Sequence, residues 1–234
     1  MKIAVMQPYF MPYIGYFQMI NAVDKFVFYD DVNFIKQGWI NRNKILVNKR
    51  DFLFTVPIDN SSQNGLIKDA KINDKLFSEW KNKLIKTLYQ NYKKAPHFDE
   101  VNSIIENILQ SENRLISRLA INSVIAISNY LDIKTVFIIA SEKYNNKELD
   151  RLKRLLDICK EENAEQYINA MGGQLLYAKE DFLVEKIQLN FIKSNPIEYK
   201  QFSDEFLPFL SIIDVLMFNP VEKVKTFLDR YELL

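Results

Sequence analysis

Short apolar runs alternate with amphipathic stretches along the chain, and this alternation predicts strands separated by helices. Apolar runs that stop at a polar or turn-forming residue predict strands at Lys2 to Met6, Phe26 to Tyr29, Val136 to Ala140, Gln166 to Ile168 and Gln188 to Ile192. The first three of these runs are apolar enough to predict buried strands. Two further runs, Ile45 to Val47 and Phe52 to Val56, flank a polar stretch and predict a β-hairpin.

Apolar residues at helical spacing predict helices between and after these strands. The expected helices are Pro12 to Ala22, one that begins near Leu76, Phe98 to Leu109, Arg114 to Leu131, Asn146 to Glu162, Leu175 to Phe182, Leu210 to Phe218 and Val221 to Tyr231. In the helix from Asn146 to Glu162, the expected inward-facing residues are Leu149, Leu152, Leu155, Leu156 and Cys159. The stretch from Asn60 to Gly65 reads NSSQNG and predicts a polar loop.

Strands that alternate with helices are typical of a mainly parallel α/β sheet. We therefore predict a single Rossmann-like α/β domain over residues 1–234. The β-hairpin and the helices over about 45–131 would form an insertion between βα units, and a C-terminal helical tail would occupy about 203–234. The sequence contains no Pro/Gly/Ser-rich linker that would indicate a second domain.

Composition narrows the classes of function. The formal net charge is +1, so bulk electrostatics give no support for stable binding to nucleic acid or to an acidic membrane. The single cysteine, Cys159, excludes an intrachain disulfide and fits a reducing compartment. The uncharged stretch from Ile3 to Val23 is long enough to span a bilayer, but Pro8, Pro12 and Gly15 interrupt it. We therefore expect a soluble, cytoplasmic protein without membrane insertion.

Polar residues follow the predicted strands, and ligands of open α/β sheets bind beyond the carboxyl ends of strands. The residues at these ends are Gln7, Pro8, Tyr9 and Phe10; then Asp30, Asp31, Asn33, Lys36, Gln37, Trp39, Asn41 and Arg42; then Ser141, Glu142 and Lys143; and then Asn169, Gly172, Gly173 and Gln174. Because these loops should lie along one edge of the sheet, they would bring carboxylates, cations, amides, aromatic rings and a glycine pair together. The sequence therefore predicts the functional site at this edge.

Three short motifs at this edge have both a functional and a structural interpretation. Asp30 and Asp31 could bind Mg²⁺ or hold sugar hydroxyls, or one of them could cap the next turn. The segment from Trp39 to Asn43 combines a stacking face, amides and a guanidinium suited to phosphate or carboxylate, or it is a polar loop with a buried Trp. Gly172 and Gly173 could present backbone N–H groups to an anion, although a plain turn is the commoner outcome.

The residues that most enzymes use for metal or nucleophilic chemistry are scarce. His97, the only histidine, precedes a predicted helix. It could act as a general base, but a loop or cap residue is the preferred interpretation. One histidine and one cysteine exclude a Cys/His zinc cluster, and no GxSxG motif is present. Cys159 is interpreted as a core residue. We therefore predict no metal site, and the cofactor, if any, stays unknown.

The strand-end residues belong to longer segments that resemble the WbqC-like family. The chain reads MQPYFMPYIGYFQMINAVDKFVFYDDVNFIKQGWINRNKI near its start, then FTVPI, YINAMGGQLLYAKEDF, IQLNFI and LSIIDVLMFN in that order. The first segment is the most specific, and the resemblance covers almost the whole chain. It implies a role in bacterial surface polysaccharide, O-antigen or lipopolysaccharide biosynthesis, with acyl or aminoacyl decoration of an amino sugar.

The resemblance also implies a set of site residues. As catalytic residues it suggests Asp30, Asp31, Asn41 and Arg42. As substrate-binding residues it suggests Gln7, Pro8, Tyr9, Phe10, Tyr13, Gly15, Tyr16, Trp39, Asn43, Tyr167, Gly172 and Gly173, and Tyr177 is a further motif position. Lys143 is added to the predicted substrate-binding residues because it follows the third buried strand. Arg42 and the glycine pair would hold a diphosphate, an aromatic side chain would stack on the base or sugar, and Asp30 or Asp31 would act as a base or hold the amine.

We therefore expect a transferase that acts on a nucleotide-activated sugar or another nucleotide ligand. The acyl donor is open between a coenzyme A ester, an amino acid with ATP, and a charged tRNA. The first strand, the loop and the glycine at a helix start are also similar in layout to HxGH nucleotidyltransferases (the HUP class), although Tyr13-Ile14-Gly15-Tyr16 lacks both histidines. This leaves a nucleotidyltransferase or adenylating enzyme as one alternative and a non-catalytic scaffold of a glycan-assembly complex as another. The sequence does not decide the oligomeric state, and a homodimer is one of the possibilities.

Overall fold

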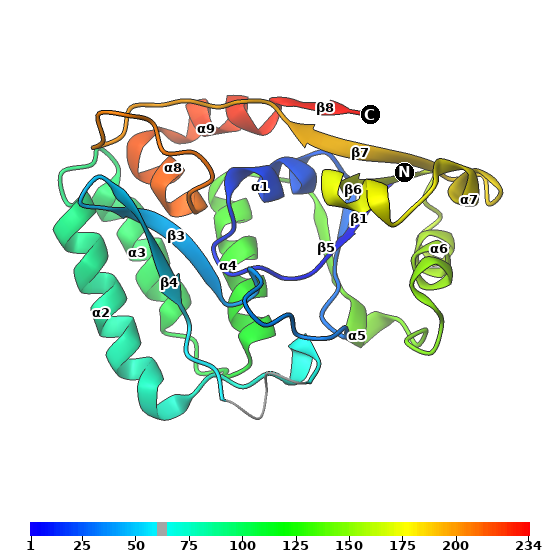
Figure 1. Ribbon diagram of the computed structural model, residues 1–234, viewed down its shortest axis with the longest axis horizontal. Helices are drawn as coiled ribbons and strands as arrows, with labels where there is room; N and C mark the ends of the chain where they lie inside the picture. The colour runs from blue at the N-terminus through cyan, green and yellow to red at the C-terminus, as the bar shows by residue number, and fades with distance from the viewer. Residues whose placement is uncertain (60–64) are drawn as a thin grey trace.

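One mainly parallel sheet forms the centre of the molecule. In the computed structural model, which describes residues 1–59 and 65–234, the sheet has six strands in the order β5-β2-β1-β6-β7-β8 (Figure 1). The strands are β1 (Lys2–Met6), β2 (Lys25–Phe28), β5 (Val136–Ile139), β6 (Gln166–Ala170), β7 (Gln188–Ser194) and β8 (Tyr231–Leu233). The first five run parallel, and β8 pairs antiparallel with β7. The prediction of a mainly parallel α/β fold is confirmed.

Successive side chains of each strand pack against different helices, because a strand presents alternate residues to opposite faces. On β1, Ala4 packs with helices α1 (Ile14–Asn21) and α4 (Ile116–Tyr130), whereas Ile3 and Val5 pack with helices α6 (Arg151–Glu161) and α7 (Lys179–Leu183). Figure 1 shows α4 and α6 on opposite sides of the sheet. The sheet is therefore covered on both faces, which explains the apolar runs in β1 and β2.

The chain reverses its direction of travel across the sheet once. It moves outward from β1 to β2 and β5, and then returns to place β6 on the free side of β1. Lys2 of β1 is the register partner of Gln166 of β6. The carboxyl ends of β1 and β6 therefore flank the topological switch point, which is where ligands of such sheets bind.

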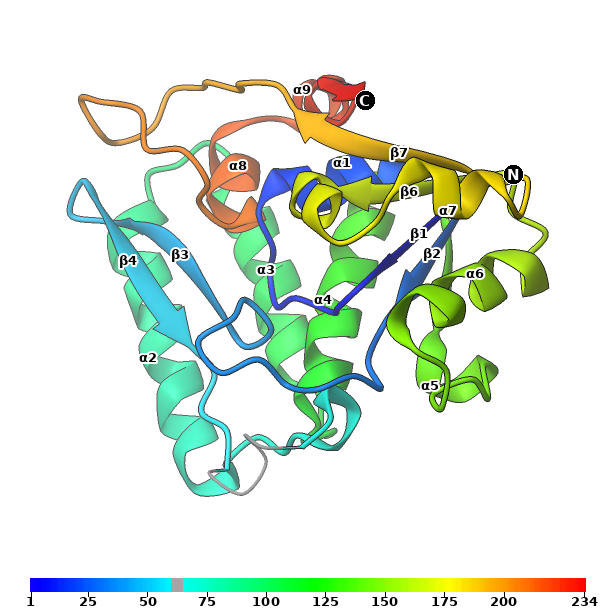
Figure 2. The same ribbon diagram turned by 45° about the vertical axis from the view of Figure 1, so that its right-hand side comes forward.

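A β-hairpin and two helices extend the molecule on one side. The hairpin strands β3 (Arg42–Val47) and β4 (Arg50–Thr55) pair antiparallel. Helices α2 (Asp74–Tyr92) and α3 (Phe98–Leu109) follow in the chain, with the short 3₁₀ turn η2 (Ile67–Asp69) before them. Figures 1 and 2 show the hairpin beside α2, and α3 beside α4. Near the end of the chain, α8 (Ile212–Phe218) and α9 (Val221–Leu228) pack on the same side as α1.

Several sequence predictions need correction. The strand at Val136 is less buried than predicted, and Val136 is 55% exposed, because β5 is the edge of the sheet and has a neighbour only on the β2 side. The helix predicted from Asn146 begins at Arg151, where the Asp150 side chain accepts a hydrogen bond from the Lys153 N–H and caps it. Leu149 therefore lies before the helix and is 41% exposed instead of buried.

Two other segments differ in the type of element. The helix predicted over 175–182 is divided into the 3₁₀ turn η3 (Met171–Leu175) and α7, because Tyr177 and Ala178 are extended or turn-like between them. The last predicted helix ends at Leu228, and β8 follows it as an unpredicted strand. The short helix α5 (Ala140–Lys143) was also not predicted. The loop predicted at Asn60 to Gly65 lies, apart from Gly65, outside the described residues.

The uncharged stretch near the start of the chain divides between β1, a loop and α1. Within residues 1–59 and 65–234, no helix combines the length and the apolar character that crossing a bilayer requires.

Candidate ligand-binding site

A cleft of about 770 Å³ opens at the switch point. Its walls come from the carboxyl ends of β1, β2 and β6, from η3 and from the first turns of α6. The polar and aromatic lining residues are Gln7, Tyr29, Asp31, Asn33, Lys147, Arg151, Arg154, Tyr167, Asn169 and Tyr177, together with Gly172 and Gly173. The volume is within the range of sites for small ligands. The predicted position of the site, beyond the strand ends, therefore coincides with a cleft.

A buried ion pair forms the base of the cleft. Arg154 Nη2 donates to Asp31 Oδ2 over 2.5 Å, and both side chains are at most 5% exposed. Arg154 Nε donates to Asn146 Oδ1 over 2.8 Å, and the guanidinium lies 4.5 Å from the centre of the Tyr29 ring. These contacts fix the guanidinium, since a buried Arg needs partners for its donors.

The second carboxylate oxygen of Asp31 is free. Asp31 Oδ1 is buried and has no hydrogen-bond partner among the described residues, although Asp31 lines the cleft. A buried carboxylate oxygen without a partner has lost its hydration without compensation. A hydroxyl or an ammonium group of a ligand in the cleft would supply the missing hydrogen bond. Asp31 is therefore the candidate acceptor for a ligand in this cleft.

Two exposed cations stand at the mouth of the cleft. Lys147 precedes α6, and Arg151 is its first residue. Neither side chain has an ion-pair partner among the described residues, whereas Arg154 is already matched with Asp31. The lining thus carries three cations and one carboxylate, an excess of two positive charges. Such an excess suits an anionic ligand, and Arg151 in particular suits phosphate.

Tyrosines form the sides of the cleft. Burial raises the pKa of Tyr29 and of Tyr177 above the ordinary value, and nearby Arg154 and Arg151 respectively oppose this shift. Both phenols are therefore protonated at neutral pH and can donate hydrogen bonds. Tyr167 stacks on Phe182 with ring centres 5.3 Å apart, and burial raises its pKa well above the ordinary value. The ring of Tyr167 is thus part of the wall and of the core below it.

The two glycines of η3 have different surroundings. A Cβ atom on Gly173 would lie 2.4 Å from Asn169 Nδ2, so Gly173 lets the Asn169 side chain pack against the turn. A Cβ atom on Gly172 would meet nothing within 4 Å. Gly173 is therefore required by close packing next to a lining residue, and Gly172 leaves its side of the cleft open.

The cleft brings together only part of the predicted site. Of the predicted catalytic and substrate-binding residues, those that line it are Gln7, Asp31, Tyr167, Gly172 and Gly173. Tyr177, the further motif position, also lines it. These residues come from the ends of three strands that are distant in sequence.

Asp30 has a different environment from Asp31. Its two carboxylate oxygens accept from the Ser141 N–H at 3.0 Å and the Ser141 hydroxyl at 2.7 Å. Burial raises the pKa of Asp30, and the bonds from Ser141 act in the opposite direction. Asp30 is not among the lining residues of the cleft. It connects the end of β2 to the start of α5, which is a structural role but not the predicted capping of the next turn.

The predicted residues from Trp39 to Asn43 also lie outside the cleft. The Arg42 guanidinium donates to the carbonyls of Gly38 and Gln37 and lies 5.8 Å from the Trp39 ring centre. The Asn41 amide donates to the Val56 carbonyl at 2.9 Å, and the Asn43 amide donates to the Met11 carbonyl at 2.8 Å. These side chains hold the hairpin in place. Trp39 is 42% exposed, in contrast to a buried Trp.

The remaining predicted residues divide between core, loop and surface. Pro8 and Phe10 are buried, and the Tyr16 hydroxyl donates to the Gln7 carbonyl at 2.8 Å. Tyr9 packs against Tyr16, with ring centres 5.5 Å apart. Tyr13 and Gly15 line another pocket, near α8. Lys143 forms an ion pair with Glu162 over 2.5 Å, away from the cleft lining.

Of the residues outside the predicted site, His97 precedes α3 without a side-chain capping bond, and Cys159 is buried as predicted.

Sequence reasoning missed the basic residues of the cleft. Lys147, Arg151 and Arg154 lie between β5 and β6, in a segment interpreted only as an amphipathic helix. A signal was present, because Arg151 and Arg154 are three positions apart and share a helix face. That face begins immediately after the loop at a strand end, where ligands bind.

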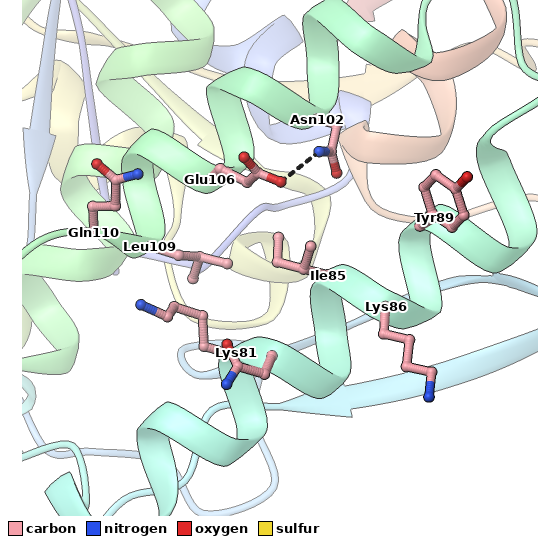
Figure 3. A pocket seen from close by; sticks show the side chains of 9 residues that line it. Lys81, Ile85, Lys86, Tyr89, Asn102, Glu106, Leu109 and Gln110 are labelled. Carbon is pink, nitrogen blue, oxygen red and sulfur yellow. Dashed lines mark hydrogen bonds between the residues drawn. The ribbon is translucent and has the colours of Figure 1, made fainter.

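A second groove, between α2 and α3, is a weaker candidate for a ligand-binding site. It has a volume of about 480 Å³ and is lined by side chains of Lys81, Ile85, Tyr89 and Glu106, among others (Figure 3). Asn102 donates to Glu106 over 2.7 Å across one helical turn. The lining residues come from α2, α3 and the residue that follows α3, and not from a strand end, and Lys81 and Lys86 point in different directions in Figure 3. The cleft at the switch point is therefore the better candidate.

No cluster of three or more His, Cys, Asp or Glu suited to a metal occurs in the part of the chain that the structure describes.

The fold and the cleft define a doubly wound α/β protein with a polar cleft at its switch point. The chain belongs to the WbqC-like protein family, which matches residues 7–226. It is also similar to the uncharacterized protein Rv1507c of Mycobacterium tuberculosis, with 28% identity over 225 residues that cover 93% of each chain. No solved structure matches. The resemblance to the WbqC-like family is thus confirmed, and the comparisons name no reaction.

Proposed function

We propose that the protein is a transferase that attaches an acyl or aminoacyl group to the amine of a nucleotide-activated amino sugar. The product would serve bacterial surface polysaccharide or O-antigen biosynthesis. The observation that carries this proposal is the cleft itself, because Asp31, whose buried Oδ1 has no partner, lines it together with the free cations of Lys147 and Arg151. A nucleotide sugar has the matching groups, since its diphosphate is anionic and its sugar offers donors.

Each part of the cleft has a role in this proposal. Arg151 and Lys147 hold the diphosphate, and a Tyr29 or Tyr177 hydroxyl donates to a sugar or phosphate oxygen. Asp31 Oδ1 accepts from the sugar amine. Arg154 is a positioning residue, because it binds Oδ2 of Asp31 and leaves Oδ1 as the oxygen without a partner.

The chemical step requires a base and an activated acyl donor. The neutral amine attacks the carbonyl carbon of an ester or thioester donor, and a C–N bond forms as the bond to the alcohol or thiol leaving group breaks. Asp31 accepts the proton that the nitrogen loses, as a carboxylate can, and this proton then passes to the oxygen or sulfur of the leaving group. Asp31 is preferred to Asp30 because both oxygens of Asp30 already bind Ser141.

The nucleotidyltransferase alternative has less support. It would place the reaction at the start of α1, where Tyr13, Ile14, Gly15 and Tyr16 correspond to the HxGH signature. The Tyr13 ring lies against Gly15, so that a Cβ atom on Gly15 would be 2.3 Å from it. Neither residue lines the cationic cleft. ATP would therefore lack the cations of α6 at that position.

Ligand binding tests the proposal directly. Thermal unfolding is measured with UDP-, GDP- and dTDP-linked sugars, each with and without a free amine, and with ATP. We expect a rise in Tm with a nucleotide amino sugar, since a ligand that binds only the folded state stabilises it. Stabilisation by ATP alone, with no effect of any nucleotide sugar, would contradict the proposal.

Two matched variants locate the binding site. Arg151→Ala should weaken binding of the nucleotide sugar roughly tenfold or more, as expected for loss of one charge-assisted phosphate contact. Lys153→Ala removes a cation from the same helix, but Lys153 is 72% exposed, pairs with Asp150 and does not line the cleft. It should leave the affinity unchanged. Equal effects of the two variants would indicate a general charge effect instead of a site.

A further inference from the structure

A separate pocket of about 650 Å³ lies at the carboxyl end of β7. It is enclosed by the start of α1, by α8 and by the segment 194–210 that follows β7. Figures 1 and 2 show α8 next to the start of α1, and the Ile212 N–H donates to the Pro12 carbonyl at 2.8 Å. Ser194, at the end of β7, lines the pocket, and β7 is the strand beside β6. The pocket and the cleft therefore open at the ends of neighbouring strands.

The pocket and the cleft have opposite charge. Most pocket-lining side chains are apolar or aromatic, and the charged ones are Glu198 and Glu205, with no Lys, Arg or His among the described lining residues. Neither glutamate has an ion-pair partner in the described part of the chain, and both are exposed. An apolar space with two unmatched carboxylates complements a ligand that has an apolar body and a protonated amine.

A buried network keeps the pocket in shape. The Tyr199 hydroxyl donates to Asp214 Oδ2 at 2.6 Å, and Gln201 Nε2 donates to the same oxygen at 2.7 Å. Gln201 Oε1 also accepts from the Leu207 N–H at 2.9 Å. These bonds fix both ends of the turn that carries Glu205. The pocket is therefore formed before a ligand arrives.

An exposed aromatic residue stands at the mouth of the pocket. Phe209 is 77% exposed and has a φ of 58°, a region that a bulky side chain rarely adopts. Its ring lies edge-on to Tyr13, with ring centres 6.4 Å apart. Strained backbone that holds an apolar ring in solvent is a feature of ligand sites. Phe209 and Tyr13 together offer an aromatic surface to the apolar part of a ligand.

We propose that this pocket binds an apolar aminoacyl compound, that is, an apolar amine whose carboxyl group is esterified or amidated. The two glutamates attract the ammonium group and repel a free carboxylate, so the pocket favours an aminoacyl ester or amide over the free amino acid. The assignment of this compound as the acyl donor rests on the proposed function, whereas its binding to the pocket does not.

Three small molecules with the same phenyl ring and similar carbon chains provide the test. L-phenylalaninamide has the ring and the ammonium, L-phenylalanine adds a free carboxylate, and 3-phenylpropionamide lacks the ammonium. Isothermal titration calorimetry should detect the first and show the other two to be at least roughly tenfold weaker. Equal affinity for all three, or no binding of the amide, would overturn the proposal.

Variants connect the binding to the pocket. The double variant Glu198→Gln and Glu205→Gln should weaken binding of phenylalaninamide roughly tenfold or more. Asp204→Asn is the matched control, because Asp204 adjoins Glu205 but pairs with Lys49 and does not line the pocket. It should leave the affinity unchanged, and an equal loss would overturn the proposal.

The two proposals can fail separately. Arg151→Ala should weaken the nucleotide sugar and leave phenylalaninamide binding intact. If the nucleotide sugar binds and the amide does not, only the pocket assignment fails. If the amide binds the pocket and no nucleotide sugar binds the cleft, the proposed function fails and the aminoacyl site stands.

Discussion

Arg154 and Asp31 are joined by a 2.5 Å ion pair in which both side chains are buried, although 122 residues lie between them in the chain. The pair connects α6 to the end of β2 and forms the base of the cleft. One oxygen of Asp31 is thereby used by the fold, and the other has no hydrogen-bond partner among the described residues. In the proposed function, stability and ligand binding would depend on the same pair.

Loss of Arg154 should destabilise the protein strongly. Arg154→Met leaves Asp31 buried without its cation, and breaking a buried pair on one side costs about 3–5 kcal/mol. Adding Asp31→Leu to this variant removes the unpaired charge and should restore part of that stability. Urea unfolding of the two single variants and the double variant measures the coupling between the residues. Additive effects in this cycle would contradict the interpretation.

The two adjacent glycines of η3 should differ in their tolerance of alanine. Gly173→Ala places a Cβ atom 2.4 Å from Asn169 Nδ2, so it should cost about 1–3 kcal/mol and displace a lining residue. Gly172→Ala meets nothing within 4 Å and no glycine in the described chain has a positive φ, so stability should be unchanged or slightly higher. Thermal unfolding and nucleotide-sugar binding compare the two. Similar effects at both positions would argue against the packing explanation.

Glu162 should contribute stability that depends on pH. Burial opposes its ionisation, but Lys143, Lys25 and the Tyr144 hydroxyl bind the carboxylate and lower its pKa to about 2, from an ordinary value of 4.5. Because the folded state has the lower pKa, the stabilisation is complete above pH 4.5 and is lost as the pH falls through about 2. Glu162→Gln should therefore cost about 1.5–3 kcal/mol at pH 7 and progressively less in acid.

Urea unfolding at several pH values, with Glu161→Gln as the control, measures this dependence. Glu161 is the exposed neighbour in the chain and should show little effect at any pH. A cost of Glu162→Gln that stays constant down to pH 3 would show that the ionised carboxylate is not the source of the stability.

The hydroxyl of Tyr92, a fully buried residue of α2, should contribute to stability through two hydrogen bonds. It accepts from the Leu46 N–H at 2.6 Å and donates to Asp214 Oδ1 at 2.7 Å. Burial raises the pKa of Asp214, and its hydrogen bonds from Tyr199, Tyr92 and Gln201 oppose this shift. Tyr92→Phe leaves two buried groups short of a partner and should cost about 1–3 kcal/mol. Tyr89→Phe, on the exposed face of α2, should be neutral in the same denaturation measurement.

The sequence could predict elements whose periodicity agrees with their final environment. After an initial lysine in each strand, β1 and β2 are apolar because helices cover both faces of the sheet, and α3 lies at its predicted limits. The edge position of β5 could not be predicted, because an apolar run does not say how many neighbours a strand has. The strand β8 has only three residues and is held by pairing with β7, which no local pattern encodes.

The same distinction applies to the site. The rule that ligands bind beyond strand ends predicts the edge at which the cleft opens, and with it the lining residues Gln7, Asp31 and the glycine pair. It could not separate Asp31 from Asp30, because that depends on Ser141 and Arg154, both over 100 residues away. Arg42 was expected at the ligand, but local carbonyls satisfy its guanidinium first. Sequence adjacency to a motif therefore does not decide which side chains face a cleft.

The pairing of β1 with β6 has a consequence for the order of folding events. Lys2 meets Gln166 only after the intervening chain has been arranged, and such distant pairings form slowly because closing a long loop is entropically unfavourable. The hairpin and the α2–α3 pair involve near neighbours in sequence and can form earlier. During refolding, ligand binding should therefore recover later than helical content, which would make the cleft a reporter of the last docking step.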